Sequence, residues 1–397
     1  MILAFLEFPE FVSFENPRPR KLPQTWKDDI KYALICCEKC YSDDSETQEI
    51  GIEDGDGTIC YFDFNKDSKR LHIAFRGSLN VKDWLVDLNT NLGIDQDLDW
   101  GQAVKFHKGF LETSKKCVPD IKKRIDELIQ VGPCPNEVIL TGHSLGGALA
   151  AISHILLIKA FPVTVDHDIK FKCITFAMPL FGNLALREKL KLEKDARYLD
   201  SYHFVRGGDF VPALLLIEND NGNGNIGPMI ASLLTGDNQN TSQIMEEVMK
   251  KLSDYLEDEE EDISKVEISA MEEEKLDKLK EKRKKRLKSE DDYVPIGKYK
   301  FLWKSIVEDM PETPALNHDF IFNLENDAIV EKALANSLKI LKASFGMGGM
   351  LGVVFKARQA HKLENYDEDI KKCFPSYIYV RRIIVRIATC MQYKVDF

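Results

Sequence analysis

The chain has 397 residues and 44% hydrophobic content, enough for one large domain or two smaller ones with a buried core. Its formal net charge of −11 argues against non-specific nucleic-acid binding, and we expect no nucleic-acid partner. Nine cysteines without disulfide or zinc spacing predict reduced thiols in a cytoplasmic protein. The apolar start is interrupted by Glu7 and Glu10, which does not fit a signal peptide. No window reaches the roughly 18 apolar residues of a membrane span.

The first part of the chain predicts one helix and two strands. Helical periodicity covers residues 24–41, and β-favouring runs follow at residues 58–64 and 71–75. The second run leads into a short polar loop that contains Ser78. A loop at the carboxyl end of a strand can supply one backbone N–H of an oxyanion hole, which makes Ser78 a candidate donor. The alternative is an ordinary turn serine.

Residues 138–150 carry the strongest chemical signal in the chain. A β-favouring run leads into a G-x-S-x-G pattern centred on Ser144, and an alanine- and leucine-rich helix follows directly. This order of strand, tight turn and helix is the context of a nucleophile elbow. Gly142 and Gly146 keep side chains out of the crowded bend. The N–H of Leu145, at the start of the helix, is a second candidate donor to an oxyanion.

Further strands are expected at residues 169–177 and 202–206. Because strands alternate with helices, we predict a mostly parallel central sheet covered by helices on both faces. Asp209 comes shortly after the second of these strands and 65 residues after Ser144. In a Ser, Asp, His chain order it is the candidate triad acid, which orients the histidine. A turn or helix-capping aspartate is the alternative.

Four consecutive motifs resemble those of the class 3 lipases in order and spacing. They lie at residues 75–87, 104–110, 141–148 and 175–183. The resemblance covers roughly residues 55–215 and resumes near residue 293, and Asp209 fits the family's D-x-V-P motif. It implies an α/β-hydrolase fold and hydrolysis of ester bonds in acylglycerols or phospholipids.

The composition changes after residue 215. An acidic block at residues 257–262 and a basic run at residues 282–288 lie in a charged, helix-like segment. We expect residues 216–291 to be a charged helical insertion between two parts of the hydrolase domain, residues 1–215 and 292–375. A solvated protrusion is the favoured interpretation. A regulatory lid, a patch for anionic membranes and a nuclear-localisation signal are alternatives.

The C-terminal part resembles the plant immune-signalling branch of lipase-like proteins. Residues 295–302 are similar to the returning strand of that branch, and residues 324–334 to the helix after it. The glycine-rich run at residues 345–355 is interpreted as buried packing, with an acyl-pocket wall as the alternative. The tail at residues 376–397 has no assigned role.

Chain order places the triad histidine after Asp209, where only His318 and His361 qualify among the eight histidines. His361 precedes an apparent helix start, and its His-x-L-x-x-Tyr arrangement, which ends at Tyr366, resembles the family's terminal histidine motif. His361 is therefore the favoured base. His107 resembles a family position but precedes the serine, so it cannot be the base by chain order.

The sequence as a whole predicts a soluble serine hydrolase that acts on lipid esters. Ser144 is the nucleophile, His361 the base and Asp209 the acid, while Leu145 and Ser78 donate backbone N–H groups. No metal or cofactor is implied. The expected partner is a lipid ester substrate, with transient contact to a membrane or lipid-droplet surface. A lipase-like signalling or binding scaffold without turnover is the rival, and a thioesterase or peptidase with the same triad is a third option.

Overall fold

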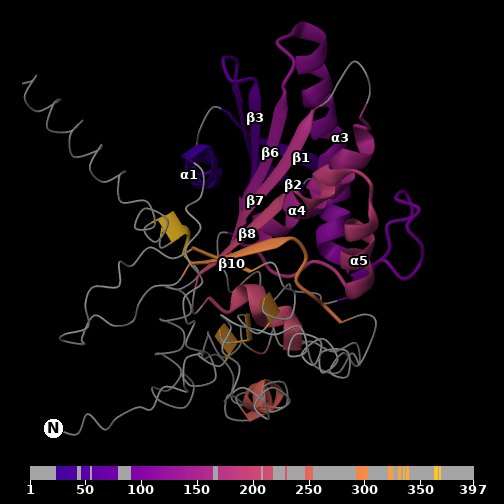
Figure 1. The fold of residues 1–397 in the computed structure, drawn as a ribbon, viewed down its shortest axis with the longest axis vertical. Helices are drawn as coiled ribbons and strands as arrows, with labels where there is room; N and C mark the ends of the chain where they lie inside the picture. The colour runs from indigo at the N-terminus through magenta and orange to yellow at the C-terminus, as the bar shows by residue number, and fades with distance from the viewer. Residues whose placement is uncertain are drawn as a thin grey trace, which may run out of the picture.

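The protein contains an eight-stranded sheet with helices on both of its faces (Figure 1). The computed structural model describes residues 24–42, 46–53, 56–78, 91–163, 169–206, 209–217, 229, 246–253, 292–302, 321–324, 330–331, 334–335, 337–338, 362–364 and 366–367. The strands are β1 (Thr47–Glu53), β2 (Asp56–Asn65), β3 (Arg70–Phe75), β6 (Glu137–His143), β7 (Lys170–Phe176), β8 (Ser201–Arg206), β9 (Lys298–Leu302) and β10 (Ile321–Leu324). A separate two-stranded ribbon pairs β4 (Leu92–Gly93) with β5 (Phe106–His107).

The strands of the large sheet follow the order β1-β2-β3-β6-β7-β8-β9-β10. The five strands from β3 to β9 are parallel, whereas β1, β2 and β10 pair antiparallel at the two edges. In the parallel part, Phe75 lies opposite Gly142, and Gly142 opposite Thr175. The carboxyl ends of β3, β6 and β7 therefore lie side by side at one end of the strands, where ligands bind in open α/β folds.

Helices lie against both faces of this sheet. They are α1 (Gln24–Lys39), α3 (Lys108–Val131), α4 (Leu145–Ala160) and α5 (Leu184–Leu192), with the short 3-10 helices η1 (Ala196–Leu199) and η2 (Val211–Ile217). In Figure 1, α1 stands on one side of the strands, and α3, α4 and α5 stand on the other. The side chains of β6 alternate accordingly: Ile139 packs in the α1 cluster, and Val138 and Leu140 pack in the larger cluster with α3 and α4.

The predicted α/β-hydrolase fold, with a mostly parallel sheet covered on both faces, is confirmed by this arrangement. The expected helix at 24–41 and the expected strands at 58–64, 71–75, 169–177 and 202–206 correspond to α1, β2, β3, β7 and β8, with small shifts of their ends. The elements that were not anticipated include the edge strand β1, the long helix α3 and the helix α5.

The predicted insertion lies largely outside the described residues. Its described part includes a helical segment at residues 246–253, in which Val248 and Leu252 are fully buried in the larger core cluster. The acidic block, the basic run, the glycine-rich run at 345–355 and the tail at 376–397 all lie outside the described residues. The domain boundaries and the resemblance to the plant branch therefore stay predictions.

Candidate active site

Ser144 stands on a sharp turn between β6 and α4. Its φ of 57° and ψ of −130° are unfavourable for a residue with a Cβ, and such strain persists only where the surrounding structure holds it. The N–H of Ser144 donates to the carbonyl of Phe176 (2.9 Å), and its own carbonyl accepts from Gly147 (2.9 Å). The strand, turn and helix predicted around Ser144 are thus present, with the backbone geometry of a nucleophile elbow.

The glycines on either side of Ser144 are required by close backbone contacts. A Cβ on Gly142 would lie 2.1 Å from the carbonyl oxygen of Gly146. A Cβ on Gly146 would lie 2.2 Å from the carbonyl oxygen of Phe75, at the end of β3. Backbone atoms cannot move aside as a flexible side chain can, so both positions accept only glycine in this geometry.

The loop after β3 is held against this elbow. A Cβ on Gly77 would lie 2.5 Å from the carbonyl oxygen of His143, and the N–H of Gly77 donates to the hydroxyl of Tyr41 (3.1 Å). Ser78 is the next residue, one position from this contact. Leu145 is the first residue of α4, so its N–H is one of the first four N–H groups, which have no carbonyl acceptor within the helix. The structure thus brings the loop of Ser78 next to the N-terminus of α4.

Asp209 lies just beyond the carboxyl end of β8 and is completely buried. One carboxylate oxygen, Oδ1, accepts from the N–H of Val211 (3.1 Å), and the other, Oδ2, accepts from the hydroxyl of Tyr366 (2.6 Å). An ionised carboxylate can accept about four hydrogen bonds, so these two leave capacity for an imidazole N–H. Asp209 therefore lies at the carboxyl ends of the strands, as Ser144 does, and this is where a triad acid is expected.

Tyr366 connects the acid with the nucleophile strand. Besides its bond to Asp209, its hydroxyl accepts from the N–H of Arg206 at the end of β8 (3.0 Å). Its fully buried ring lies 6.2 Å from the ring of His143, the residue before Ser144. Burial and the neighbouring carboxylate raise the pKa of Tyr366 well above its usual value, so the phenol stays a donor to Asp209. The sequence motif included Tyr366 without assigning this contact.

His361 and His318 both lie outside the described residues. The segment after His361 is described in part, and Leu363, Glu364, Tyr366 and Asp367 are helical. His361 precedes Tyr366 by five residues, which span at most about 17 Å even when fully extended. Tyr366 itself is fixed on Asp209 by its hydroxyl, and His361 stays the predicted base.

The remaining histidines of this region have structural contacts. His107 caps α3, where its Nδ1 accepts from the N–H of Phe110 (3.3 Å), and its ring stacks on the Phe110 ring. Burial lowers the pKa of His107 to about 3, so it is neutral at pH 7. His143 is buried beside Tyr366.

Two further features of the described residues bear on function. No group of three or more His, Cys, Asp or Glu side chains among them is arranged to hold a metal ion. Within the same ranges, no helix combines the length and the apolar character needed to cross a membrane.

Comparison with known proteins supports the resemblance carried by the motifs. Residues 72–219 match the family model for Lipase (class 3). A secreted mono- and diacylglycerol lipase 1 of Fusarium solani is 29% identical over 166 residues, which are 42% of this chain and 44% of that protein. The secreted mono- and diacylglycerol lipase A of Penicillium cyclopium is 26% identical over 193 residues, covering 46% of this chain and 57% of the relative.

Among solved structures, the Rhizomucor miehei lipase propeptide complex is similar, with 20% identity and a TM-score of 0.39, over 49% of this chain and 64% of that one. The chain covers about half the length of the two curated relatives. The family resemblance thus applies to the central segment that carries Ser144 and Asp209.

Proposed function

We propose that the protein is a serine hydrolase that cleaves carboxylic ester bonds of lipids through a Ser144–His361–Asp209 triad. The observation that carries this proposal is the backbone of Ser144, a non-glycine residue held at a φ of 57° at the junction of β6 and α4. A strained turn of this kind places a nucleophile at the carboxyl ends of the parallel strands, and it has no evident value for packing alone.

In this mechanism, the Ser144 hydroxyl oxygen attacks the ester carbonyl carbon while His361 takes the hydroxyl proton. The tetrahedral oxyanion accepts hydrogen bonds from the N–H groups of Leu145 and Ser78. Its collapse releases the alcohol, which receives the proton from His361, and leaves an acyl group on Ser144. A water molecule, deprotonated by His361, then attacks the acyl carbon; the bond from that carbon to the Ser144 oxygen breaks, His361 returns the proton to Ser144, and the carboxylic acid leaves. Asp209 orients His361 and stabilises its charged form.

The substrate class is supported by the relatives, two of which are named as mono- and diacylglycerol lipases. We propose acylglycerols as the first substrates to test and phospholipids as the second. Such esters gather in membranes and droplets, so transient contact with a lipid surface belongs to the proposal. The buried Ser144, only 3% exposed, implies that part of the chain moves when a substrate enters.

The proposal is tested with a fluorophosphonate probe, which reacts with activated serines, and with a panel of glycerides, phospholipids and soluble short-chain esters. The natural protein should be labelled and should release acid from at least one ester. Ser144→Ala should lose labelling and turnover while it keeps its melting temperature. Labelling that persists in Ser144→Ala would place the nucleophile elsewhere. A natural protein that is neither labelled nor active, yet binds lipid, would favour the scaffold without turnover.

We also propose a reducing, cytoplasmic location. Seven of the nine cysteines are described by the structure, and all seven are free, six of them buried. Two relatives are named as secreted, which points the other way. Alkylation of the protein during lysis, followed by mass spectrometry, should find these cysteines reduced. A stable disulfide or a fractionation with secreted proteins would contradict this proposal.

A further inference from the structure

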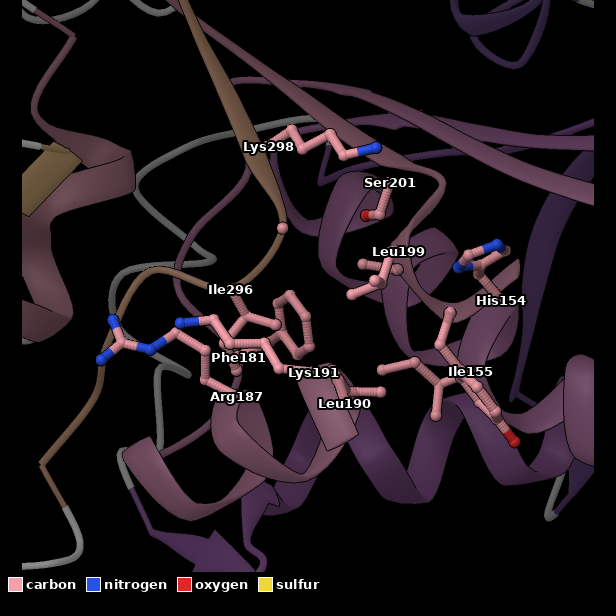
Figure 2. A pocket seen from close by; sticks show the side chains of 13 residues that line it. His154, Ile155, Phe181, Arg187, Leu190, Lys191, Leu199, Ser201, Ile296 and Lys298 are labelled. Atoms are coloured by element: carbon pink, nitrogen blue, oxygen red, sulfur yellow. The ribbon is translucent and has the colours of Figure 1, made fainter. Parts of the chain in front are cut away.

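The cavity of about 250 Å³ in Figure 2 lies at the opposite end of the strands from Ser144. It is bordered by the second half of α4, by α5 and η1, and by the start of β8. Ser144 and Asp209 lie at the carboxyl ends of the strands, whereas Ser201 on the cavity wall is the first residue of β8. Support for the candidate nucleophile comes instead from the end of α1, beside the loop of Ser78.

Tyr41 contacts the loop that follows β3. Its hydroxyl oxygen accepts a hydrogen bond from the N–H of Gly77 (3.1 Å), a buried residue directly before Ser78. Tyr41 is 38% exposed, so its ring reaches solvent while its hydroxyl lies against the buried glycine. A Cβ on Gly77 would lie 2.5 Å from the carbonyl oxygen of His143 and 2.7 Å from the Tyr41 hydroxyl. Gly77 is therefore enclosed by Tyr41 and by the residue before Ser144.

The contact with Tyr41 decides which N–H group of the loop is available to an oxyanion. A backbone N–H has one proton, so the N–H of Gly77 that donates to Tyr41 is not available to a substrate. The next N–H along the chain belongs to Ser78, the donor expected from the sequence. Only the two soft dihedrals of Gly77 separate these two peptide planes, and glycine restricts them least of all residues. The Ser78 N–H is therefore oriented only if the Gly77 peptide is held from outside.

Tyr41 is itself held in place by the end of α1. The thiol of the preceding residue, Cys40, donates to the carbonyl of Ala74 on β3 (3.1 Å). The thiol of Cys37 lies 3.3 Å from the hydroxyl of Thr141 on β6. Ala74 lies opposite Thr141 in the sheet, close to the carboxyl ends of both strands. The end of α1 is thus fixed against the two strands that lead into the loop of Ser78 and into the elbow.

A phenol suits this place because it carries no charge. Tyrosine has an ordinary pKa of about 10, and burial raises the pKa of Tyr41 further. A carboxylate at the same position would hold the N–H of Gly77 more strongly, but its negative charge would oppose the oxyanion. A neutral hydroxyl oxygen fixes the N–H without that effect.

We propose that Tyr41 is a positioning residue of the oxyanion hole, which acts on the reaction through Gly77 and Ser78. This inference rests on the hydrolase function proposed above. Tyr41 fixes the Gly77 peptide, and that peptide directs the Ser78 N–H toward the oxyanion. Donors that are fixed before the reaction stabilise the oxyanion most, because they need not reorganise when the charge develops. Loss of the Tyr41 hydroxyl therefore weakens transition-state stabilisation and not substrate binding.

The test compares Tyr41→Phe with Tyr32→Phe in the full chain. Tyr32 is the matched control because it lies on α1, is also 38% exposed, and donates its hydroxyl hydrogen bond to Asp63 on β2 rather than to the loop after β3. Tyr41→Phe should lower kcat on a soluble short-chain ester about tenfold and leave KM unchanged, the pattern of an interaction made only in the transition state. Tyr32→Phe should keep both constants.

A trifluoromethyl ketone with the acyl chain of that ester separates transition-state stabilisation from packing. It forms a reversible tetrahedral adduct with an active serine, and its oxygen takes the place of the oxyanion. Its inhibition constant should rise about tenfold in Tyr41→Phe, in step with the fall of kcat/KM, and stay unchanged in Tyr32→Phe. Unchanged inhibition of Tyr41→Phe, together with a lower kcat or melting temperature, would reduce Tyr41 to packing and overturn the proposal.

Hydrogen exchange of the Gly77 amide tests the contact without any need for activity. Tyr41→Phe removes the acceptor, so this amide should exchange about tenfold faster, whereas Tyr32→Phe should leave its exchange unchanged. Unchanged exchange of the Gly77 amide in Tyr41→Phe would overturn the proposal whatever the kinetics show. A natural protein without turnover would contradict the hydrolase function instead, and the exchange of Gly77 would still decide whether Tyr41 fixes this loop.

Discussion

At Asp209, each carboxylate oxygen has its own donor, from the backbone on one side and from a tyrosine on the other. Val211 donates to Oδ1 and Tyr366 to Oδ2, and the residue is completely buried. A fully buried carboxylate held by two donors cannot turn freely, so it can fix the orientation of a histidine. The same contact fixes the segment that follows His361.

The assignment of the base is tested by changing each candidate histidine to alanine. His361→Ala should lower kcat on a soluble ester by about a thousandfold or more, as the loss of a triad member does. His318→Ala should keep its activity and serves as the matched control. Steady-state kinetics with a short-chain ester avoids any effect of lipid-surface binding. The reverse pattern would assign the base to His318.

Tyr366 is expected to act as a positioning residue through Asp209. Tyr366→Phe removes the hydrogen-bond donor to Oδ2. The negative charge on Asp209 is then less neutralised and stabilises the protonated histidine more strongly. The acidic limb of the kcat/KM profile should therefore shift to higher pH, and kcat should fall about tenfold, which is the effect of roughly one hydrogen bond.

Tyr299→Phe is the control for Tyr366→Phe, because Tyr299 is a second buried tyrosine, on β9. It should leave the pH profile unchanged. A Tyr366→Phe variant with lower stability but a native pH profile would reduce the role of Tyr366 to packing.

At the scale of the elements, α1 is joined to the sheet by a partly buried ion-pair network. Asp29 on α1 pairs with Arg70 (2.8 Å) and Lys172 (2.9 Å), and both of these cations also pair with Glu137. The four residues come from α1, β3, β6 and β7, at the amino ends of the strands. Two positive and two negative groups balance, so the network fixes the position of α1 without adding net charge. α1 in turn carries the packing that surrounds Tyr366.

The insertion is expected to divide into a part that packs on the core and a part that does not. Replacing residues 254–291 with a short Gly/Ser linker should leave the melting temperature nearly unchanged, because this stretch is rich in charge and carries the acidic and basic runs. Differential scanning calorimetry measures the stability of this linker variant and, for comparison, of a second variant, Val248→Asp, which alters the part that packs on the core.

Val248→Asp should lower the free energy of unfolding by at least about 2 kcal/mol, since Val248 is fully buried and an unpaired carboxylate there loses its hydration. If the deletion prevents folding, residues 254–291 belong to the core. If Val248→Asp is neutral, residues 246–253 do not pack on it in solution.

At the scale of the whole molecule, four of the five buried histidines among the described residues are expected to contribute to the response to acid. Burial is the largest cause that lowers their pKa values, to about 4 for His72 and His154 and to about 3 for His107 and His203. Around His72, Asp63 and Asp29 raise the pKa and Arg70 lowers it, but these effects are smaller than that of burial. All four rings are therefore neutral in the folded protein at pH 7.

The sign of the pH effect follows from these lowered values. Unfolded histidine has a pKa of about 6.5, so between that value and 4 the unfolded chain binds more protons than the folded one. Stability is thus complete above about pH 6.5 and is lost as the pH falls, by up to about 1.4 kcal/mol per pH unit for each histidine.

Urea unfolding between pH 7.5 and 5 should show this loss. In the His154→Leu variant, the slope of the unfolding free energy against pH should be smaller by up to one proton, and the urea m-value should be unchanged. A stability that stays flat over this range would mean that the histidines are accessible to water in the folded protein.

The sequence by itself determined the elements that depend on local pattern. β6, the elbow at Ser144 and α4 were predictable because a β-favouring run, two glycines and a helix-forming run follow one another directly. β1 was missed because it is an edge strand whose Gln48 and Glu49 face solvent, so little apolar alternation marks it. α3 contains Pro119 in its interior, a residue that normally indicates the end of a helix.

The tertiary structure alone decided which distant residues meet. Asp209 was predictable by chain order, but its contact with Tyr366 joins residues 157 positions apart, and no periodicity encodes such a distance. The approach of Gly77 to Tyr41 and His143, and the cavity beside His154, likewise arise where separate elements pack on one sheet. Local patterns are set by backbone geometry within a few residues, whereas contacts between elements depend on how their buried faces fit together, which only the folded chain fixes.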